Sequence, residues 1–271
     1  MLRRIQTVSL TTLFSELGEQ AIYFLGDLGR MGLFLLHALA GLFRLPFRWR
    51  EVLRQLWFIG GGSLTVIFFT ALSTGMVLGL QGYYSLSKFG AEGMLGSAVS
   101  LSIIMELGPV LTSLMVIGRA GSAMCAEIGI MRITEQVDAL ECMAIDPFRY
   151  LISPKVLATL ISVPLLVGVF DVVGVFGGWI AGVKLMGVNS GSYFAGMEQS
   201  VTNHDLNLGM IKSVVFALLL VWICSGRGYY VQMIRGAGFG AESVSRVTTQ
   251  AVVVASISVL IFDYLLTAIL L

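Results

Sequence analysis

Long apolar segments dominate the pattern of hydrophobic and polar positions, and strand-like alternation is nowhere evident. Five of these segments approach or exceed the length of about 20 residues that a helix needs to cross a bilayer. They cover residues 57–80, 97–117, 156–183, 209–226 and 249–271. The pattern therefore predicts an all-α, polytopic membrane protein whose five-span domain occupies residues 57–271.

Residues 1–56 carry a different pattern and are predicted to form a cytoplasmic or interfacial region. Residues 17–29 mix apolar and acidic side chains as an amphipathic helix does, and the apolar stretch Met31–Phe43 is short and bounded by arginines. Segments of this kind lie along the membrane surface. We predict an N-terminal interfacial elbow helix here, and a sixth span at residues 22–43 is the alternative topology.

The composition agrees with a membrane protein. The chain of 271 residues is 56% hydrophobic and only 12% charged, and its mean hydropathy is +0.89, whereas globular domains are about 25% charged. The net charge of +1 suggests no nucleic-acid partner. The three cysteines lie far apart without CxxC spacing, so neither a disulfide framework nor a metal site is expected. The N-terminus lacks the pattern of a removable signal peptide.

Positive charge predicts the orientation, because cytoplasmic flanks of membrane helices are enriched in lysine and arginine. With the N-terminus inside, 14 of these residues fall on the inner side, in residues 1–56, 118–155 and 227–248. The outer side keeps only Lys88, Lys184 and Lys212. We therefore expect the N-terminus on the cytoplasmic side of the membrane and the C-terminus on the outer side.

Three acids lie inside the predicted spans: Glu106, Asp171 and Asp263. An ionisable group at the bilayer centre costs at least about 2.5–3.5 kcal/mol, which makes each acid a functional candidate. Glu106 precedes Leu107-Gly108-Pro109, where the proline removes a backbone hydrogen bond and is expected to kink the helix beside a cavity wall. Lys212, placed at the outer face, could pair with Asp263. The alternative is that the acids only hold helices together.

Residues 134–144 are predicted to form a short amphipathic helix in the inner loop that follows the second span. Thr134 is a plausible N-cap, and Asp146-Pro147 is expected to close the helix. Glu135, Asp138 and Glu141 share one face, and an apolar stripe occupies another. Because the inner leaflet is negatively charged and repels acidic helices, a protein partner is favoured over the bilayer surface as cover for the stripe.

Glycines recur at the spacing that lets helices pack closely, in Gly75 and Gly79 and in Gly174, Gly178 and Gly182. Packing within one chain is favoured over a dimer seam for any single pair.

Signatures of enzymes and nucleotide sites are missing. The sequence contains no GxxxxGK[ST] phosphate loop, no HExxH and no GxSxG. His204-Asp205 could act as an acid–base pair of a membrane acyltransferase, but adjacent residues in a polar loop are more often solvated. We expect no catalytic residues and no cofactor in this chain.

Residues 118–154 (GRAGSAMCAEIGIMRITEQVDALECMAIDPFRYLISP) closely resemble the signature of the MlaE (YrbE) permease family. Residues 75–83 (GMVLGLQGY), 106–110 (ELGPV) and 212–217 (KSVVFA) agree with it, and the likeness covers almost the whole chain. It implies the homodimeric permease of an ABC transporter that carries phospholipid between the inner and outer membranes and maintains outer-membrane lipid asymmetry. The implied partners are a second copy, a cytoplasmic ATPase that binds ATP, a STAS-domain protein and a periplasmic MCE-domain hexamer.

The resemblance also implies roles for single residues. A lipid cavity between two copies would be lined or gated by Leu78, Glu106, Leu107, Lys212 and Asp263. The helix at 134–144 would be the coupling helix seated on the ATPase through Glu135, Asp138, Leu140 and Glu141. One departure stands out, because the family carries an arginine where this chain has Met105. We therefore expect Glu106 to lack a charge partner and to be protonated.

Two other functions remain open on the sequence. A proton-coupled secondary transporter would use Glu106, Asp171 and Asp263 as a relay. A membrane enzyme would depend on His204.

Overall fold

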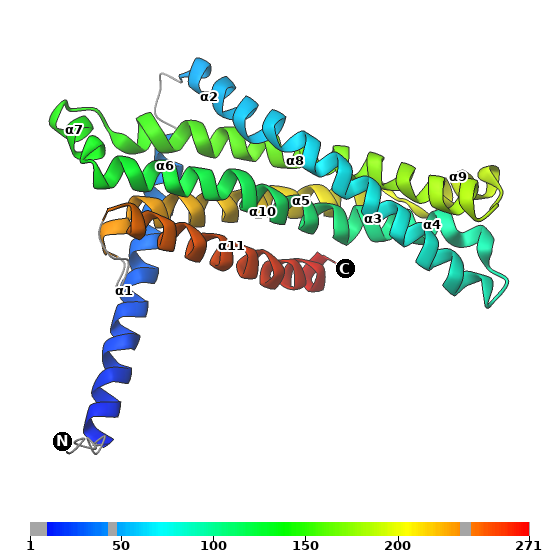
Figure 1. The fold of residues 1–271 in the computed structure, drawn as a ribbon, viewed down its shortest axis with the longest axis horizontal. Helices are drawn as coiled ribbons and strands as arrows, with labels where there is room; N and C mark the ends of the chain where they lie inside the picture. The colour runs from blue at the N-terminus through cyan, green and yellow to red at the C-terminus, as the bar shows by residue number, and fades with distance from the viewer. Residues whose placement is uncertain (1–9, 43–47, 234–239, 271) are drawn as a thin grey trace, which may run out of the picture.

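A computed structural model describes residues 10–42, 48–233 and 240–270, and within these ranges the regular structure is helical, without strands. Five helices are long and apolar enough to cross a membrane. They lie side by side along the long axis of the molecule (Figure 1). The predicted all-α fold and the count of five spans are confirmed.

Each of the first three spans is built from α-helical segments joined or flanked by short π-helical turns, and the second span also begins with a 3₁₀ turn. The first span, Trp49–Ser87, joins α2 (Trp49–Leu56), η1 (Trp57–Gly61) and α3 (Gly62–Ser87). The second, Glu92–Ile133, joins η2 (Glu92–Met94), α4 (Leu95–Ser102), η3 (Ile103–Leu107), α5 (Gly108–Val116), η4 (Ile117–Gly121) and α6 (Ser122–Ile133). The third, Phe148–Leu185, joins η5 (Phe148–Ile152), α8 (Ser153–Trp179) and η6 (Ile180–Leu185).

The other spans are single helices, α10 (Asn203–Tyr229) and α11 (Ala241–Leu270). Four further helices complete the described part of the fold: α1 (Leu10–Leu42), α7 (Gln136–Cys142), α9 (Ser190–Ser200) and η7 (Val231–Met233). In Figure 1, α7 lies at one end of the bundle and α9 at the other.

The second span is longer than expected. Residues 118–133, predicted as the first part of an inner loop, continue the helix to Ile133. At 1.5 Å per residue its 42 residues extend about 60 Å, twice the hydrocarbon core of about 30 Å. The helix therefore carries α7 well beyond the membrane core. The predicted irregularity before Pro109 is present as the π-turn η3, which accommodates the missing backbone donor.

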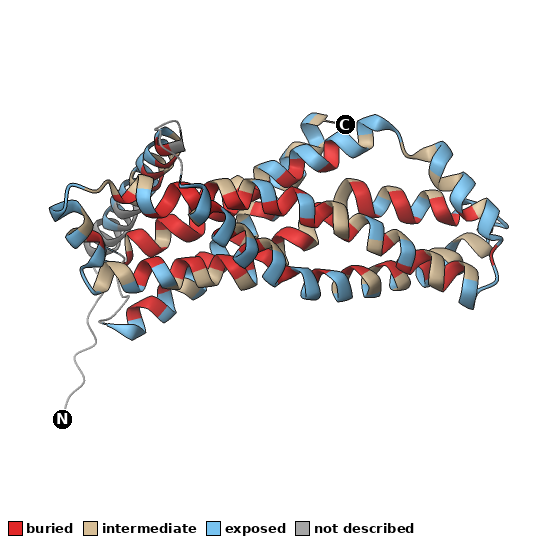
Figure 2. Ribbon diagram, turned by 90° about the horizontal axis from the view of Figure 1, so that it is seen from above, coloured by how far each residue is buried: buried red, intermediate tan, exposed pale blue. Residues whose placement is uncertain are grey.

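A seam of glycines lies between α3 and α8. A Cβ on Gly75 would collide with the carbonyl of Gly174, and one on Gly79 would crowd the carbonyl of Gly178. Only glycine allows these backbones to approach so closely. The expectation that this spacing serves packing within one chain is confirmed. Figure 2 shows the buried residues along the facing sides of the helices.

The N-terminal helix α1 runs steeply away from the bundle axis (Figure 1). The two predicted pieces, residues 17–29 and Met31–Phe43, belong to one helix of 33 residues. It is fixed to α10, where the indole of Trp222 donates to the carbonyl of Met31 at 2.7 Å and Arg227 pairs with Asp27 at 3.0 Å.

The alternative of a sixth span at residues 22–43 gains no support, since α1 is not among the five candidate spans found in the described residues. Several residues of the sequence predictions lie outside the described ones: residues 1–9 and 43–47 of the N-terminal region, Arg235 of the third inner loop and Leu271.

Candidate functional site

Three charged side chains from three spans meet in one cluster, which we call the Lys212 triad (Lys212, Glu106 and Asp263). Lys212 on α10 is completely buried. Its Nζ lies 2.7 Å from Oε2 of Glu106 in η3 and 2.9 Å from Oδ1 of Asp263 on α11. The triad thus joins the second, fourth and fifth spans through one ammonium group.

Two polar contacts complete the triad. Lys212 donates to the backbone carbonyl of Met105 at 3.0 Å, and the hydroxyl of Thr267 lies 3.0 Å from Oε1 of Glu106. A lysine keeps its charge in a low-dielectric site only when such acceptors replace water. The Glu106 side chain is 39% exposed, so the triad opens to the outside of the single chain.

The structure confirms one expectation about these residues and corrects two. The Lys212–Asp263 ion pair is present. Lys212 does not begin its span, however, because α10 starts nine residues earlier at Asn203, and the Lys212 side chain is completely buried. Glu106 does not lack a charge partner: Lys212 supplies the cation from a different helix, although Met105 stands where the family has arginine.

The two leucines predicted to line a lipid cavity, Leu78 and Leu107, lie on different helices and in different surroundings. Leu78 on α3 lines a small groove of about 170 Å³ together with Ala98 and Ser102 of the second span. Leu107 is half-buried in η3 next to Glu106. Neither leucine contributes to the larger pocket described next.

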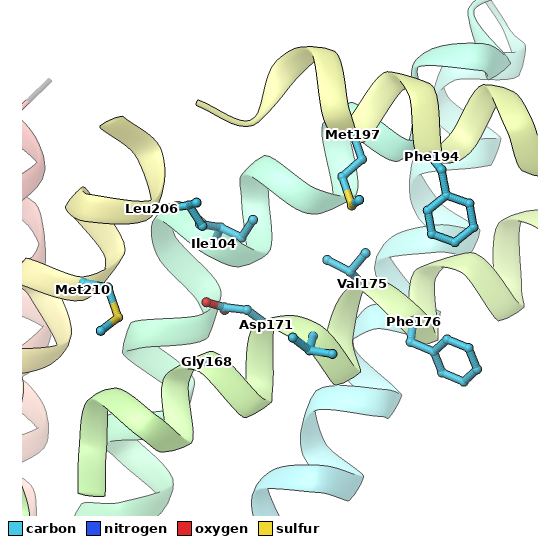
Figure 3. A pocket seen from close by; sticks show the side chains of 10 residues that line it. Ile104, Gly168, Asp171, Val175, Phe176, Phe194, Met197, Leu206 and Met210 are labelled. Atoms are coloured by element: carbon cyan, nitrogen blue, oxygen red, sulfur yellow. The ribbon is translucent and has the colours of Figure 1, made fainter. Parts of the chain in front are cut away.

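An apolar pocket of about 490 Å³ lies among the second span, α8, α9 and α10 (Figure 3). Its lining residues are Ile104, Gly168, Asp171, Val172, Val175, Phe176, Phe194, Met197, Leu206 and Met210. Asp171 is the one ionisable residue among them. No ion pair or hydrogen bond joins it directly to Glu106 or Asp263 among the described residues.

At the other end of the bundle, α7 forms in place of the helix predicted at 134–144. Thr134 is not its N-cap: the Thr134 hydroxyl bonds back to the carbonyl of Ile130 in α6, and Glu135 precedes α7 with a left-handed backbone at φ 57°. The helix ends at Cys142, and Ala144 is also left-handed. Asp146 does not close α7 but accepts from the backbone of Phe148 at 3.0 Å and begins the next helix.

The predicted coupling residues divide into exposed and engaged side chains. Glu135 and Glu141 are exposed and Leu140 is half-buried. Asp138 forms an ion pair of 2.5 Å with Arg132 on α6. Val137, in the apolar stripe, is fully buried within the chain, so α6 and its neighbours cover part of the surface that was expected to need a partner.

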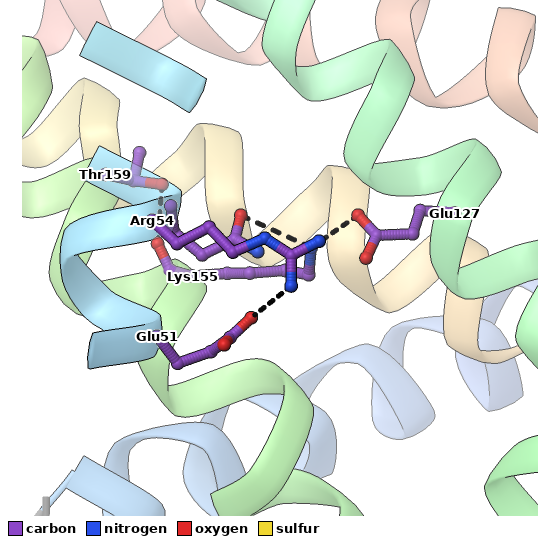
Figure 4. A network of polar contacts seen from close by, with 6 residues as sticks. Glu51, Arg54, Glu127, Lys155 and Thr159 are labelled. Carbon is purple, nitrogen blue, oxygen red and sulfur yellow. Dashed lines mark hydrogen bonds and ion pairs between the residues drawn. The ribbon is translucent and has the colours of Figure 1, made fainter. Parts of the chain in front are cut away.

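Two cations with partners on other helices were missed as sites by sequence reasoning, the buried Lys155 and the half-buried Arg119. Lys155 at the start of α8 is 1% exposed, and its Nζ lies 2.6 Å from Oε2 of Glu127 on α6 (Figure 4). Arg119 donates to the carbonyl of Phe58 at 2.6 Å and to Ser63 at 3.1 Å, which connects the second span to the first. Both residues flank apolar segments, so the sequence analysis counted them only among the positive charges that predict the orientation in the membrane.

The acid that follows His204 in the sequence is engaged away from any acid–base role with it. This acid, Asp205, is engaged in a capping box at the start of α10, where its Oδ2 accepts from the backbone and the hydroxyl of Thr202, both at 2.8 Å. The carboxylate therefore stabilises a helix terminus.

Comparison with known proteins identifies the family. The model of "Permease MlaE" matches residues 52–269. The "Intermembrane phospholipid transport system permease protein MlaE" of Haemophilus influenzae is 43% identical over 96% of this chain and 98% of its own length. A "Probable ABC transporter permease protein" of Rickettsia bellii is 41% identical over 95% and 97% of the two chains.

A more distant relative comes from a plant. The chloroplastic protein TRIGALACTOSYLDIACYLGLYCEROL 1 of Arabidopsis thaliana is 32% identical over 81% of this chain and 61% of its own length. With the family match extending over all five spans and relatives aligned nearly end to end, the chain belongs to the MlaE permease family.

Proposed function

We propose that this chain is the non-catalytic permease subunit of an ABC transporter that moves phospholipid between the inner and outer membranes and so maintains outer-membrane lipid asymmetry. The name of the Haemophilus influenzae relative supports the cargo. The observation that carries the proposal in this chain is the Lys212 triad, a buried polar centre that is open to one side of an otherwise apolar bundle.

The cavity for the lipid lies between two copies of the chain and is lined or gated by Leu78, Glu106, Leu107, Lys212 and Asp263. The exposure of α11 supports this arrangement. In its most apolar stretch of 18 residues only 11% of the residues are buried within the chain, whereas in the corresponding stretch of α10 67% are buried. Five of the exposed apolar residues of α11 share one face: Val253, Ile257, Leu260, Ile261 and Tyr264. A second copy or bound acyl chains would cover that face.

Energy comes from a separate subunit. The sequence carries no phosphate loop, so ATP is bound and hydrolysed by a cytoplasmic ATPase. α7 transmits the motion through the exposed Glu135 and Glu141 and through Leu140, while the Asp138–Arg132 pair holds α7 on the long helix beneath it. A STAS-domain protein and a periplasmic MCE-domain hexamer complete the assembly.

The proposed location is the bacterial inner membrane, with the N-terminus in the cytoplasm and the C-terminus in the periplasm. The excess of arginine and lysine on one side supports this orientation. α1 lies along the inner surface as an elbow, because it leaves the bundle steeply and is anchored by Trp222 and Arg227 (Figure 1).

Cysteine cross-linking in native membranes tests the dimeric cavity. Ile257→Cys places a thiol on the exposed face of α11, where Ile257 is 52% exposed, and should give a covalent dimer on oxidation. Val172→Cys on α8, where Val172 is 73% exposed, is the matched control and should remain monomeric. A dimer from the control but not from Ile257→Cys would contradict the arrangement.

A further inference from the structure

A pocket of about 380 Å³, which we call the Arg48 pocket, lies between the start of the first span and the segment that follows α7. Its lining residues are Arg48, Ala144, Ile145, Asp146, Arg149 and Tyr150. The lining carries two guanidinium groups against one carboxylate, and Oδ1 of that carboxylate already accepts from the backbone N–H of Phe148 at 3.0 Å. The balance of charge therefore favours an anionic occupant.

Arg48 is positioned by an aromatic ring and not by an acid. Its Cζ lies 4.0 Å from the centroid of the Tyr150 ring. The Arg48 side chain is exposed, and within the described ranges no carboxylate forms an ion pair with it. With the ring on one side of the guanidinium, its N–H groups can donate to two oxygens of one phosphate.

An exposed apolar stripe begins one residue after Arg48. Trp49, Leu53 and Trp57 follow one another at intervals of four residues and are 65%, 64% and 77% exposed. This spacing places them on one side of the helix over a length of about 12 Å. Tryptophan gathers where a membrane meets water. A charged pocket that continues into an apolar stripe matches the two halves of an amphiphile.

Contacts with α1 indicate the depth of the pocket. The ring of Phe148, one residue before Arg149, lies 5.4 Å from the ring of Phe34 and 5.4 Å from that of His37, both on α1. The proposed function places α1 along the inner surface of the membrane. The level of the Arg48 pocket rests on that proposal, and it is the level of the inner headgroups.

We propose that the Arg48 pocket binds the phosphodiester headgroup of an anionic phospholipid from the inner leaflet, such as phosphatidylglycerol. Arg48 and Arg149 contact the phosphate oxygens, and the acyl chains lie along the apolar stripe. Zwitterionic lipids carry the same phosphate, but their ammonium group cancels its charge, so a pocket with a positive lining binds them less well.

A lipid explains the surface better than an acidic segment of a partner protein does. Such a segment would satisfy the arginines, but it would leave the stripe that ends at Trp57 exposed. The site shares no residue with the Lys212 triad or with the residues proposed for coupling to the ATPase.

Photo-cross-linking of the full-length chain in nanodiscs tests the proposal. A phosphatidylglycerol with a diazirine in its headgroup should label Ile145 or Tyr150, located by mass spectrometry of peptides. Excess unlabelled phosphatidylglycerol should compete, whereas phosphatidylethanolamine and phosphatidylcholine should compete about tenfold less well, corresponding to about 1.4 kcal/mol. Glycerophosphoglycerol, the same headgroup without acyl chains, should not compete at the same concentration.

Two double variants separate the pocket from the general positive charge of this region. Arg48→Gln combined with Arg149→Gln should lower labelling about tenfold. Arg50→Gln combined with Arg54→Gln removes the same charge from exposed side chains of α2 outside the pocket, and this matched control should label as the wild type does. Leu53→Gln, which interrupts the stripe and keeps every arginine, should lower labelling about threefold.

Equal labelling of the Arg48 and Arg149 double variant and the wild type, or equal competition by all three lipids, would overturn the proposal. Competition by glycerophosphoglycerol would assign the pocket to a soluble phosphate ester instead. Loss of labelling in the complex with the co-purified ATPase would show that the partner covers the pocket, which also contradicts the lipid.

If the double variant fails to fold, the competition measured on the wild type decides. The labelling requires neither the ATPase nor ATP. Its outcome is therefore separate from that of ATP-driven lipid transfer, which tests the proposed function.

Discussion

Lys212 is a buried ammonium group whose stability depends on both of its acidic partners. Breaking a buried ion pair by removing one partner is costly because the remaining charge is left without compensation. Neutralising all the members avoids that penalty. The triad is therefore expected to behave as one unit, in which single substitutions cost more than the combined one.

Lys212→Met should lower the free energy of unfolding by about 3–5 kcal/mol, because Glu106 and Asp263 would face each other without a cation. Adding Glu106→Gln and Asp263→Asn should restore most of the loss. Chemical unfolding in detergent micelles, followed by circular dichroism, measures both. A single variant as stable as the wild type would show that the ammonium does not hold the triad together.

The sequence identifies the members of the Lys212 triad, but it does not predict which of them contact one another. Intramembrane charges are rare enough to identify Glu106, Lys212 and Asp263 individually. Which of them meet depends on which helices are neighbours, and periodicity within one helix does not determine that. For this reason the Lys212–Asp263 pair was predictable as one option, while the Glu106–Lys212 pair and the buried Lys155–Glu127 pair were not.

At the scale of helices, the glycine seam between α3 and α8 fixes how closely the first and third spans pack. Gly75→Val should strongly destabilise the protein, because its Cβ would strike the backbone carbonyl of Gly174, which cannot move without shifting α8. Gly168 lies on α8, as Gly174 does, but has open space around it, so Gly168→Ala should be neutral or stabilising by up to about 1 kcal/mol. Thermal unfolding in detergent compares the two, and equal melting temperatures would contradict the seam.

Element ends were less predictable than the elements themselves. The apolar runs indicated every span, since about 20 apolar residues leave few alternatives. The boundaries of α7, in contrast, depend on left-handed backbones at Glu135 and Ala144, residue types that rarely adopt this conformation. Thr134 and Asp146-Pro147 have ordinary capping patterns, but they cap other helices. The Thr134 hydroxyl bonds to the end of α6, and Asp146 accepts from the backbone at the start of the helix that follows α7.

The exposed acids of α7 provide a test of the proposed coupling. Glu135→Lys combined with Glu141→Lys should weaken co-purification of the ATPase, because both side chains are exposed and neither substitution disturbs the Asp138–Arg132 pair. Glu198→Lys, an exposed acid on α9 at the opposite end, is the matched control. Unchanged ATPase recovery with the double variant would remove these two residues from the interface.

At the scale of the whole molecule, the features group by position along the bundle axis. The acidic helix α7 and the anchored α1 lie at one end and α9 lies at the other (Figure 1). The Lys212 triad and the Asp171 pocket lie at the same level of the second span and α10, where Ile104 and Met210 line the pocket and Glu106 and Lys212 belong to the triad. The separation of α7 from both suits a subunit that receives motion at one end and handles a membrane lipid elsewhere. The angle of α1 could not be inferred from sequence, because it depends on contacts with α10.

Lipid transfer in proteoliposomes tests the central claim most directly. The chain reconstituted with its co-purified ATPase and remaining partners should move a fluorescent phospholipid to acceptor membranes only when ATP is present. The chain alone should move none under a pH gradient. Transfer driven by the pH gradient without the ATPase would contradict the account and favour a proton-coupled transporter.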